Sequence, residues 1–392
     1  MLLLHLLILG LLGLALCAVL ANLSCFHGLR EAPVPEDVPL VSILVPARNE
    51  ARNIEACVAS LLAQDYPRCQ IVVLDDGSDD GTGELVRALG LSEESGSRTL
   101  LHGQALPAGW VGKNWACHQL SQRARGEYFF FTDADTVHAP GTVRAAVACA
   151  REQRADLLSA WPRLLTGTLG EQLVVPMILV LGMVLYPHWL VLWLQAHPDR
   201  AARLPARWLR MLGAANGQCL FFTRAAYERL GGHWARRDHL VEDVAFGRAV
   251  AERMGEGMRL WNCEALSFST VRMYRSLGET WEGFTKNIWP AFEGRPGGFL
   301  LVGVWQAAVF LYPFLALCGP AAWRPYALAE VGLIYAIRLL LTVRFRTSWR
   351  GALLHPLGHA LALAIGLNSW RRSAGDGVLW KGRRYRPSAP TA

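Results

Sequence analysis

Three acidic pairs along this chain carry side chains that can do chemistry. Two of them, Asp75–Asp76 and Asp133–Asp135, come directly after apolar runs, IVVL and YFFFT. The third, Glu242–Asp243, opens a stretch with a helical pattern, VEDVAFGRAVAERM. Carboxylates bind hard divalent cations and, where their pKa is suitable, act as general bases. Each acidic pair can therefore bind a metal ion or act as a base, or it can simply stabilise a turn or a helix start.

The DxD pair at Asp133 and Asp135 favours a metal site. Residues i and i+2 of an extended strand end face the same side, so both carboxylates can bind one Mg²⁺ or Mn²⁺ ion. A capping turn is the alternative, because this pattern is common by chance. The position directly after the apolar strand predicted over 127–135 favours the metal.

The other charged groups each have a simpler alternative. The acids at 75–76 precede Gly-Ser, which also fits an ordinary turn. Glu242 and Asp243 would be favoured in a first helical turn by the helix dipole alone. Lys113, in LPAGWVGKNWACHQ, is placed to meet a phosphate or to be a solvated loop lysine.

The elements that position these residues read as an α/β domain. From residue 41 to about 266, short β-rich runs alternate with helical patterns, which is typical of a sheet covered on both faces. The helix predicted over 51–64 would connect the first two strands as one βαβ unit. Ligands of doubly wound sheets bind at the carboxyl ends of the strands, where the acids lie. The predicted strands are 41–47, 71–76, 127–135, 156–161 and 218–223.

Four motifs in order resemble the family 2 glycosyltransferases. They are VPARNE (45–50), LDDGSDDGT (74–82), TDAD (132–135) and VED (241–243). The resemblance implies the GT-A fold, the doubly wound sheet of nucleotide-diphospho-sugar transferases. It also implies a nucleotide-sugar donor, with a UDP-sugar expected, and inversion of the sugar's anomeric configuration.

The resemblance assigns a donor pocket to the first two motifs. The backbone at Pro46 and Ala47 and the acids Glu50 and Asp76 would line it, with Asp76 favoured over Asp75.

The same resemblance assigns the reacting groups. Asp133 and Asp135 would share the metal ion with the donor's diphosphate, which Lys113 also contacts. Asp243 would be the base that deprotonates the acceptor, and Glu242 would orient it or contact the sugar.

Three further features bear on the resemblance. The QxxRW motif of processive members is absent from the sequence, which favours transfer of a single sugar. Arg272, Arg275 and Lys286 can contact diphosphate or lipid headgroups, or belong to a basic amphipathic helix at a membrane surface. The GWVGKNWA loop and the closing VLWKGRRY look like bacterial enzymes of carotenoid and hopanoid biosynthesis.

Apolar segments predict membrane attachment at both ends of a catalytic domain spanning 40–292. The chain is 52% hydrophobic, and residues 1–20 carry no Lys, Arg, Asp or Glu. Residues 1–23 are predicted to be a transmembrane anchor rather than a cleaved signal peptide, because no basic residue precedes the apolar run. The apolar insert near 173–194 is expected to be interfacial or re-entrant, with a buried domain helix as the alternative.

The C-terminal segments at 299–318, 326–343 and 352–370 make residues 299–370 a second membrane region. Three full crossings would place the basic tail, 371–392, outside, against the positive-inside rule. We therefore expect 352–370 not to cross fully and the tail to be cytosolic.

Charge and cysteine usage set the expected surroundings. The net charge of +7 favours anionic membrane lipids over nucleic acid, which we exclude as a partner. Nine cysteines without a CxxC pair predict neither a zinc site nor a disulfide framework, and fit a reducing cytosol. The expected location is the bacterial inner membrane, multi-pass, with the catalytic domain facing the cytoplasm.

The sequence thus predicts a metal-dependent, non-processive glycosyltransferase with a lipid acceptor, first a carotenoid or hopanoid-like terpenoid. Alternatives are transfer to a polyprenyl phosphate or a sphingolipid-like glycolipid acceptor, and a membrane scaffold with a degenerate transferase fold. The sugar, the acceptor, the choice between Mg²⁺ and Mn²⁺ and the oligomeric state stay open.

Overall fold

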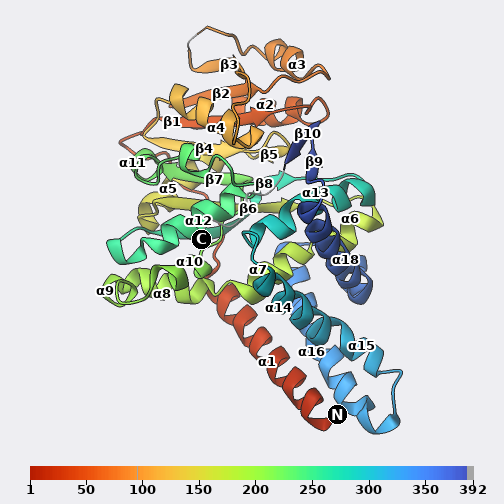
Figure 1. The fold of residues 1–392 in the computed structure, drawn as a ribbon. Helices are drawn as coiled ribbons and strands as arrows, with labels where there is room; N and C mark the ends of the chain where they lie inside the picture. Colours follow the sequence, from red (N-terminus) through yellow and green to blue (C-terminus); the bar gives the residue numbers. More distant parts are fainter. Residues whose placement is uncertain (95, 386–392) are drawn as a thin grey trace. The chain divides into compact units, whose positions relative to one another are not determined.

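The computed structural model describes residues 1–94 and 96–385, which divide into two compact units (Figure 1). The sheet unit comprises Phe26–Arg163 and His188–Val271. The helical unit comprises Met1–Cys25, Leu164–Pro187 and Arg272–Ala392. Parts of the predicted catalytic domain, 164–187 and 272–292, are thus grouped with the terminal helices rather than with the sheet.

An eight-stranded mixed sheet, in the order β3-β2-β1-β4-β7-β6-β8-β5, is the framework of the sheet unit. Strands β1, β2, β3 and β4 pair in parallel, whereas the β4–β7, β6–β7 and β5–β8 pairs are antiparallel. The α/β class with a large sheet and terminal apolar helices is therefore confirmed, with an antiparallel half added to the predicted parallel sheet. The strands are β1 (Val41–Ala47), β2 (Cys69–Asp75), β3 (Arg98–His102), β4 (Tyr128–Thr132), β5 (Thr136–His138), β6 (Leu157–Leu164), β7 (Cys219–Thr223) and β8 (Leu260–Val271).

Helices cover both faces of this sheet because its strands are apolar on both sides. In β1, Ile43 and Val45 join one buried cluster and Leu44 joins the other. Alternate residues of a strand point to opposite faces, so such a run needs cover on each. The helices of the unit are α2 (Ile54–Leu62), α3 (Thr82–Ala88), α4 (Gly112–Arg123), α5 (Thr142–Gln153), α8 (His188–Ala196), α9 (Pro198–Ala201), α10 (Ala206–Leu212), α11 (Arg224–Arg229) and α12 (Glu242–Glu252), with 3₁₀ turns η1 (His233–Arg236) and η2 (Met254–Glu256).

The strand ends differ from the prediction in one place that matters for function. Strand β4 ends at Thr132 rather than at Asp135. The Thr136 amide donates to the Asp133 carbonyl at 3.1 Å, which closes a turn over 133–136 and starts β5 at once. Strands β3, β5 and β8 had no predicted counterpart, since β3 and β5 are short and β8 mixes polar residues into its apolar run.

The helical unit contains the apolar segments expected to meet lipid. Three of its helical stretches in the described chain are long and apolar enough to cross a membrane: Leu2–Cys25, Pro296–Ala316 and Ala321–Phe345. The predicted insert near 173–194 would add a fourth only as a broken pair, Leu169–Leu185 with His188–Ala196. The helices are α1 (Leu2–Cys25), α6 (Leu169–Val174), α7 (Met177–Leu185), α13 (Leu277–Ala291), α14 (Pro296–Gln306), α15 (Tyr312–Ala316), α16 (Arg324–Phe345), α17 (Trp349–Leu353) and α18 (His355–Ala374), with a π-helical turn η3 (Ala307–Leu311) and a 3₁₀ turn η4 (Ala321–Trp323).

The predicted segment 352–370 and the tail form other structures. Helices α17 and α18 cover that segment, and they are not among the described helices that pass the same length and composition test. The predicted tail begins as the last turn of α18 and continues into a hairpin of β9 (Val378–Trp380) and β10 (Arg383–Tyr385). Residues 386–392 of the predicted tail lie outside the described residues.

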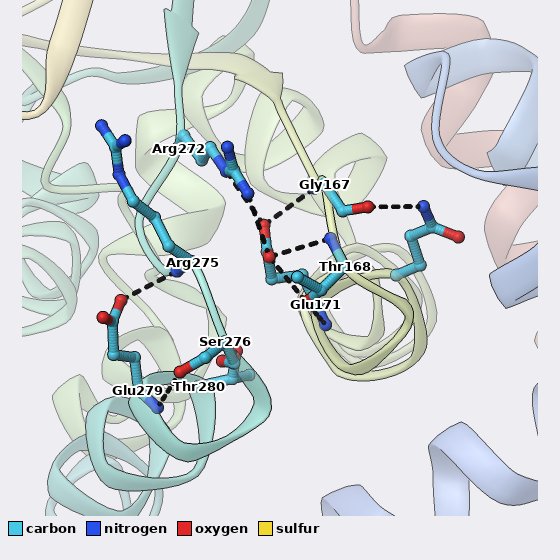
Figure 2. A network of polar contacts seen from close by, with 9 residues as sticks. Gly167, Thr168, Glu171, Arg272, Arg275, Ser276, Glu279 and Thr280 are labelled. Carbon is cyan, nitrogen blue, oxygen red and sulfur yellow. Dashed lines mark hydrogen bonds and ion pairs between the residues drawn. The ribbon is translucent and has the colours of Figure 1, made fainter.

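A buried carboxylate organises the polar part of the helical unit (Figure 2). Glu171 accepts hydrogen bonds from the Gly167 and Thr168 amides at 2.9 Å, and the Arg272 guanidinium pairs with it at 3.1 Å. Burial alone would raise the pKa of Glu171, but Arg272 and these donors outweigh it and lower the pKa to about 2. Arg272 is therefore engaged by protein, while the Arg275 amide donates to the Glu279 carboxylate at 2.8 Å.

A buried serine gives the first stability prediction. The Ser42 hydroxyl, fully buried in β1, donates to Gln70 Oε1 at 2.6 Å and accepts from the Arg125 and Gly126 amides at 3.1 and 2.8 Å. Ser42→Ala removes an acceptor shared by two amides, which costs about 1–3 kcal/mol of unfolding free energy. We expect a lower melting temperature of the full-length protein in detergent. Exposed Ser92→Ala is the control, and equal melting of the two variants contradicts the prediction.

Candidate functional site

The DxD acids lie in the turn between β4 and β5. Asp133 opens this turn and Asp135 immediately precedes β5, so the strand-end geometry from which the pair was predicted is wrong. A tight turn replaces it, held between β4, which pairs with β1 and β7, and β5, which pairs with β8. The two carboxylates are thus carried by a short, doubly anchored loop rather than by alternating strand positions.

A buried histidine fixes both ends of this turn. Thr132 donates its hydroxyl to the Gln218 carbonyl at 2.8 Å, so it accepts from His138 Nε2 at 2.9 Å. His138 Nδ1 then accepts from the Ser269 hydroxyl at 3.0 Å. Burial lowers the pKa of His138 to about 3, so the ring is neutral and has one fixed tautomer. The hydrogen bonds between Thr132 and His138 and between His138 and Ser269 therefore hold Thr132, the last residue before the acids, against strands β5 and β8.

Lys113 joins two of the acidic motifs. Its ammonium lies 2.7 Å from Asp133 Oδ1 and 2.8 Å from Glu242 Oε1. Burial favours the neutral amine, but the Asp133 and Glu242 carboxylates outweigh it and raise the pKa of Lys113 well above its usual value. The lysine predicted to meet phosphate is, in this structure, a charged bridge between carboxylates.

The start of helix α4 is tied to the loop that leads into α12. The Val111 amide donates to the Arg237 carbonyl at 2.6 Å, and Asn114 Nδ2 donates to the His239 carbonyl at 2.8 Å. Asn114 is fully buried. These bonds place Lys113, between the two anchoring residues, at the first turn of α12 that carries Glu242.

Asp243, the predicted general base, is held by two backbone amides. Its carboxylate accepts from the Gly217 amide at 2.7 Å and from the Val244 amide at 2.8 Å. Burial, and then the neighbouring Glu242 charge, raise the pKa of Asp243 to about 6, while Lys113 and the two amides oppose the rise. A Cβ at Gly217 would lie 3.0 Å from Asp243 Oδ2, so this close approach favours glycine. A carboxylate that titrates near neutrality suits proton abstraction.

The predicted donor-pocket residues meet where β1 and β2 end. Pro46 and Ala47 pair with Leu74 and Asp75 across the two strands. The Asp75 carboxylate accepts from the Ser78 amide at 3.0 Å and so closes the following turn. The turn role left open for this motif therefore falls to Asp75.

The other two acids of the predicted pocket are held from neighbouring segments. The Asp76 amide donates to the Ala47 carbonyl at 2.8 Å, and its side chain is buried. Glu50 is held by its amide, which donates to Thr82 Oγ1 at 2.9 Å, and by its carboxylate, which accepts from Asn53 at 3.0 Å.

A buried thiol lies near residues of three of the motifs. Burial raises the pKa of Cys117 well above its usual value, Lys113 opposes this, and the Glu242, Asp133 and Asp76 carboxylates raise it further. Residues from the second, third and fourth motifs thus lie within electrostatic range of a single side chain on α4. The supporting residues His138, Asn114 and Gly217 were not predicted, because nothing near them in sequence marks their long-range partners.

The acids fit a metal ion that is shared with a ligand. Carboxylate oxygens are the donors that Mg²⁺ and Mn²⁺ prefer. Within residues 1–94 and 96–385, no three His, Cys, Asp or Glu side chains form a cluster that could hold a metal ion alone. Asp133 and Asp135 would therefore supply part of the coordination, and a diphosphate the remainder, which is how Mg²⁺ is commonly bound.

The chain is similar in sequence to known glycosyltransferases. Residues 42–168 match the family model described as Glycosyl transferase family 2. The chain is 24% identical over 376 residues to the 4,4'-diaponeurosporenoate glycosyltransferase of Staphylococcus aureus (strain MRSA252), covering 92% of each chain.

Solved structures include a similar fold. The mannosyltransferase PcManGT from Pyrobaculum calidifontis, in complex with GDP-Man and Mn²⁺, matches with a TM-score of 0.50 and 20% identity, over 95% of this chain and 99% of that one. The glucosyl-3-phosphoglycerate synthase of Mycobacterium tuberculosis matches with a TM-score of 0.41 and 17% identity, over 68% and 88%. The first likeness confirms the GT-A type of mixed α/β sheet.

The lysine bridge predicts an energetic coupling. Lys113→Met leaves Glu242, 7% exposed, and Asp133 without their shared counter-ion. Because Lys113 and Asp133 are each about one-third exposed, we expect a loss of about 1–3 kcal/mol, below that of a fully buried pair. Adding Glu242→Gln to Lys113→Met should restore part of the loss in a double-mutant cycle of melting temperatures. Strictly additive effects of the two substitutions contradict the bridge.

Proposed function

We propose that this chain, a family 2 glycosyltransferase, transfers one sugar from a UDP-sugar to a lipid acceptor with inversion of configuration. The observation that carries the proposal is the convergence on Lys113. Its ammonium contacts one acid of the DxD motif and one acid of the pair that contains Asp243. A donor-binding charge and an acceptor-activating base thereby stand beside each other, as a single displacement requires.

The proposed chemistry assigns one task to each side chain. Asp243, held by the Gly217 and Val244 amides, accepts the proton of the acceptor as its oxygen attacks the anomeric carbon. Glu242 raises the pKa of Asp243 by its negative charge and is itself held by Lys113. The positive charge of Lys113 would stabilise the negative charge that develops on the leaving diphosphate. A Mg²⁺ or Mn²⁺ ion bound by Asp133 and Asp135 would neutralise the same leaving group.

The donor pocket in this proposal lies at the ends of β1 and β2. Pro46, Ala47, Glu50 and Asp76 would hold the nucleotide, and Asp76 is favoured because Asp75 is used by the turn. Asp76 is also the member of the pair that acts on Cys117 together with Asp133 and Glu242. The nucleotide would therefore extend from the β1–β2 end toward the DxD turn.

A lipid acceptor is supported by the apolar parts of the chain. Three described helical stretches can cross a membrane by length and composition, and the similar S. aureus enzyme is named for a carotenoid-type acid. A carotenoid or hopanoid-like terpenoid is the proposed acceptor. The proposed location is the cytosolic face of a bacterial inner membrane.

The sheet unit has a surface suited to lipid headgroups. Helices α8 to α10 expose large apolar side chains beside arginines, and one of these, Arg200, lies 5.1 Å from the centre of the Trp193 ring. Tryptophan and arginine together favour the interface of an anionic membrane. The exposed residues are Trp189, Trp193, Trp208, Met211, Arg200, Arg203 and Arg207.

Lipid analysis tests the proposed function directly. Lipids from bacteria that express the gene should contain a species heavier by one sugar than the same acceptor in cells that lack it. Transfer to a polyprenyl phosphate or a sphingolipid-like acceptor would appear in other lipid classes. An unchanged profile of lipid glycosylation, with the protein present in the membrane, contradicts the proposal and leaves the scaffold alternative.

The base assignment predicts a loss of turnover. Asp243→Asn should lower the rate of transfer to a hydroxyl acceptor about 10²–10⁴-fold, because the amide cannot take the proton. Binding of the nucleotide donor should be retained. Asp199→Asn, an exposed acid of the same unit, is the control. A rate near that of the wild type with a hydroxyl acceptor overturns the assignment, whereas a carboxylate acceptor would reduce the effect.

The raised pKa of Asp243 predicts the acid limb of the pH profile. Only the carboxylate form accepts a proton, so kcat/KM should fall as the pH drops through about 6. Because Lys113 lowers the pKa of Asp243, Lys113→Met should move this limb to higher pH. A profile that is flat from pH 5 to 8, or unmoved in the variant, contradicts this account.

A further inference from the structure

Three basic side chains are buried together in the helical unit. Arg338 lies on α16, and His355 and His359 lie one turn apart on α18, each with 1% of its surface exposed. The two imidazole centroids are 5.2 Å apart, and the Arg338 guanidinium lies within electrostatic range of both rings. This Arg-His-His cluster is separate from every motif assigned to sugar transfer.

The cluster has hydrogen-bonding capacity that the described protein does not use. Arg338 Nε and Nη2 and both His359 ring nitrogens are buried without a hydrogen-bond partner among the described residues, whereas the His355 ring has the Phe310 backbone as a hydrogen-bonding neighbour. Three acids of the same unit pair with other groups: Glu330 with His5 at 2.9 Å, Glu171 with Arg272 at 3.1 Å and Glu282 with Arg372 at 2.6 Å. A buried cation without a counter-ion is strongly unfavourable, so the site calls for an anion.

The walls of the cluster are aromatic and held in place. The Phe310 ring stacks on His359 at 5.2 Å, and Phe314 lies 6.1 Å from His355. Phe310 belongs to the π-helical turn η3, a feature that occurs frequently at functional sites. The Tyr335 hydroxyl donates to the Leu353 carbonyl at 2.8 Å and fixes α16 against the chain just before α18.

The hydrogen-bond donors of the cluster indicate which kind of ligand it can bind. A guanidinium and imidazole N–H groups all donate hydrogen bonds, and a guanidinium repels a metal ion that two histidines could otherwise hold. The complement is an oxyanion with several acceptor oxygens. Because α16 is one of the apolar stretches that can cross a membrane, and charged residues within such helices commonly mark ligand paths, the ligand should come from the lipid phase.

We propose that the Arg-His-His cluster binds the oxyanion of an acidic lipid. Such a lipid has a carboxylate or a phosphate group attached to a hydrocarbon tail. Binding would supply Arg338 with the counter-ion that the described protein lacks there. The inference is independent of sugar transfer, since it uses no residue of the catalytic site.

The test is a melting experiment on the full-length protein in a neutral detergent, with no sugar donor present. Oleate and dioleoylphosphatidylglycerol are titrated as the acidic probes, with oleyl alcohol and dioleoylglycerol as their neutral counterparts. We expect an acidic probe to raise the melting temperature and its neutral counterpart not to. Loss of the shift with Arg338→Met, an affinity drop of about tenfold or more, is expected because charge-assisted hydrogen bonds are removed.

Two further variants make the result decisive. Arg350→Met, which removes an exposed arginine from α17, should keep the wild-type shift. The pair His355→Gln and His359→Gln should weaken the shift while retaining the protein's charge at Arg338, and it carries the test if Arg338→Met does not fold.

The outcomes assign the ligand or reject the site. A shift by oleate alone identifies a carboxylate, and a shift by the phospholipid alone a phosphate. A shift that is equal in wild type and cluster variants overturns the proposal, as does an equal response to acidic and neutral probes.

Discussion

The ammonium of Lys113 between Asp133 and Glu242 is the interaction on which the site depends. Two carboxylates from segments far apart in sequence meet in a partly buried space, where their repulsion would be costly without a cation. The hydrogen bonds of Val111 and Asn114 to the 237–239 loop hold Lys113 between the two carboxylates. The DxD turn, helix α4 and helix α12 therefore form one electrostatic unit.

The charge of Lys113 also affects the pKa of the neighbouring Asp243, the proposed base. Asp243 is partly buried beside Glu242, which favours its protonated form, and Lys113 and two backbone amides limit that effect. As a result, the pKa of the Asp243 carboxyl group is raised to about 6. Beneath the DxD turn, neutral His138 provides rigidity without adding charge, because burial keeps it deprotonated and its hydrogen bonds fix one tautomer.

The sequence predicted what local patterns determine. Long apolar runs such as those of β1 and β2 were found because a strand covered on both faces must be apolar throughout. Strand β5 was not, because three residues carry no periodicity. Strand β4 was predicted too long, through Asp135, because the pairing of β5 with β8 that follows its end at Thr132 is a tertiary contact.

The sequence motifs predicted which residues belong to the candidate site, but not the contacts that these residues make. The motifs and their order marked Asp76, Asp133, Glu242 and Asp243, since each lies at the end of a strand or the start of a helix. The pairing of Lys113 with Glu242, like that of His138 with Ser269, joins segments more than 100 residues apart in sequence. The contacts of Lys113 with Asp133 and of Gly217 with Asp243 also join separate elements, at shorter range in the sequence. No local pattern encodes such distances, and so their physical roles emerge only from the fold.

The most direct measurement of the central claim is calorimetric binding of UDP to the full-length protein, with and without Mn²⁺ or Mg²⁺. If Asp133 and Asp135 hold a metal ion together with a diphosphate, binding should require the ion and be lost in the Asp133→Asn, Asp135→Asn double variant that still folds. UDP binding of equal affinity without the ion, or in the double variant, would contradict the assignment of these acids and the account built on them.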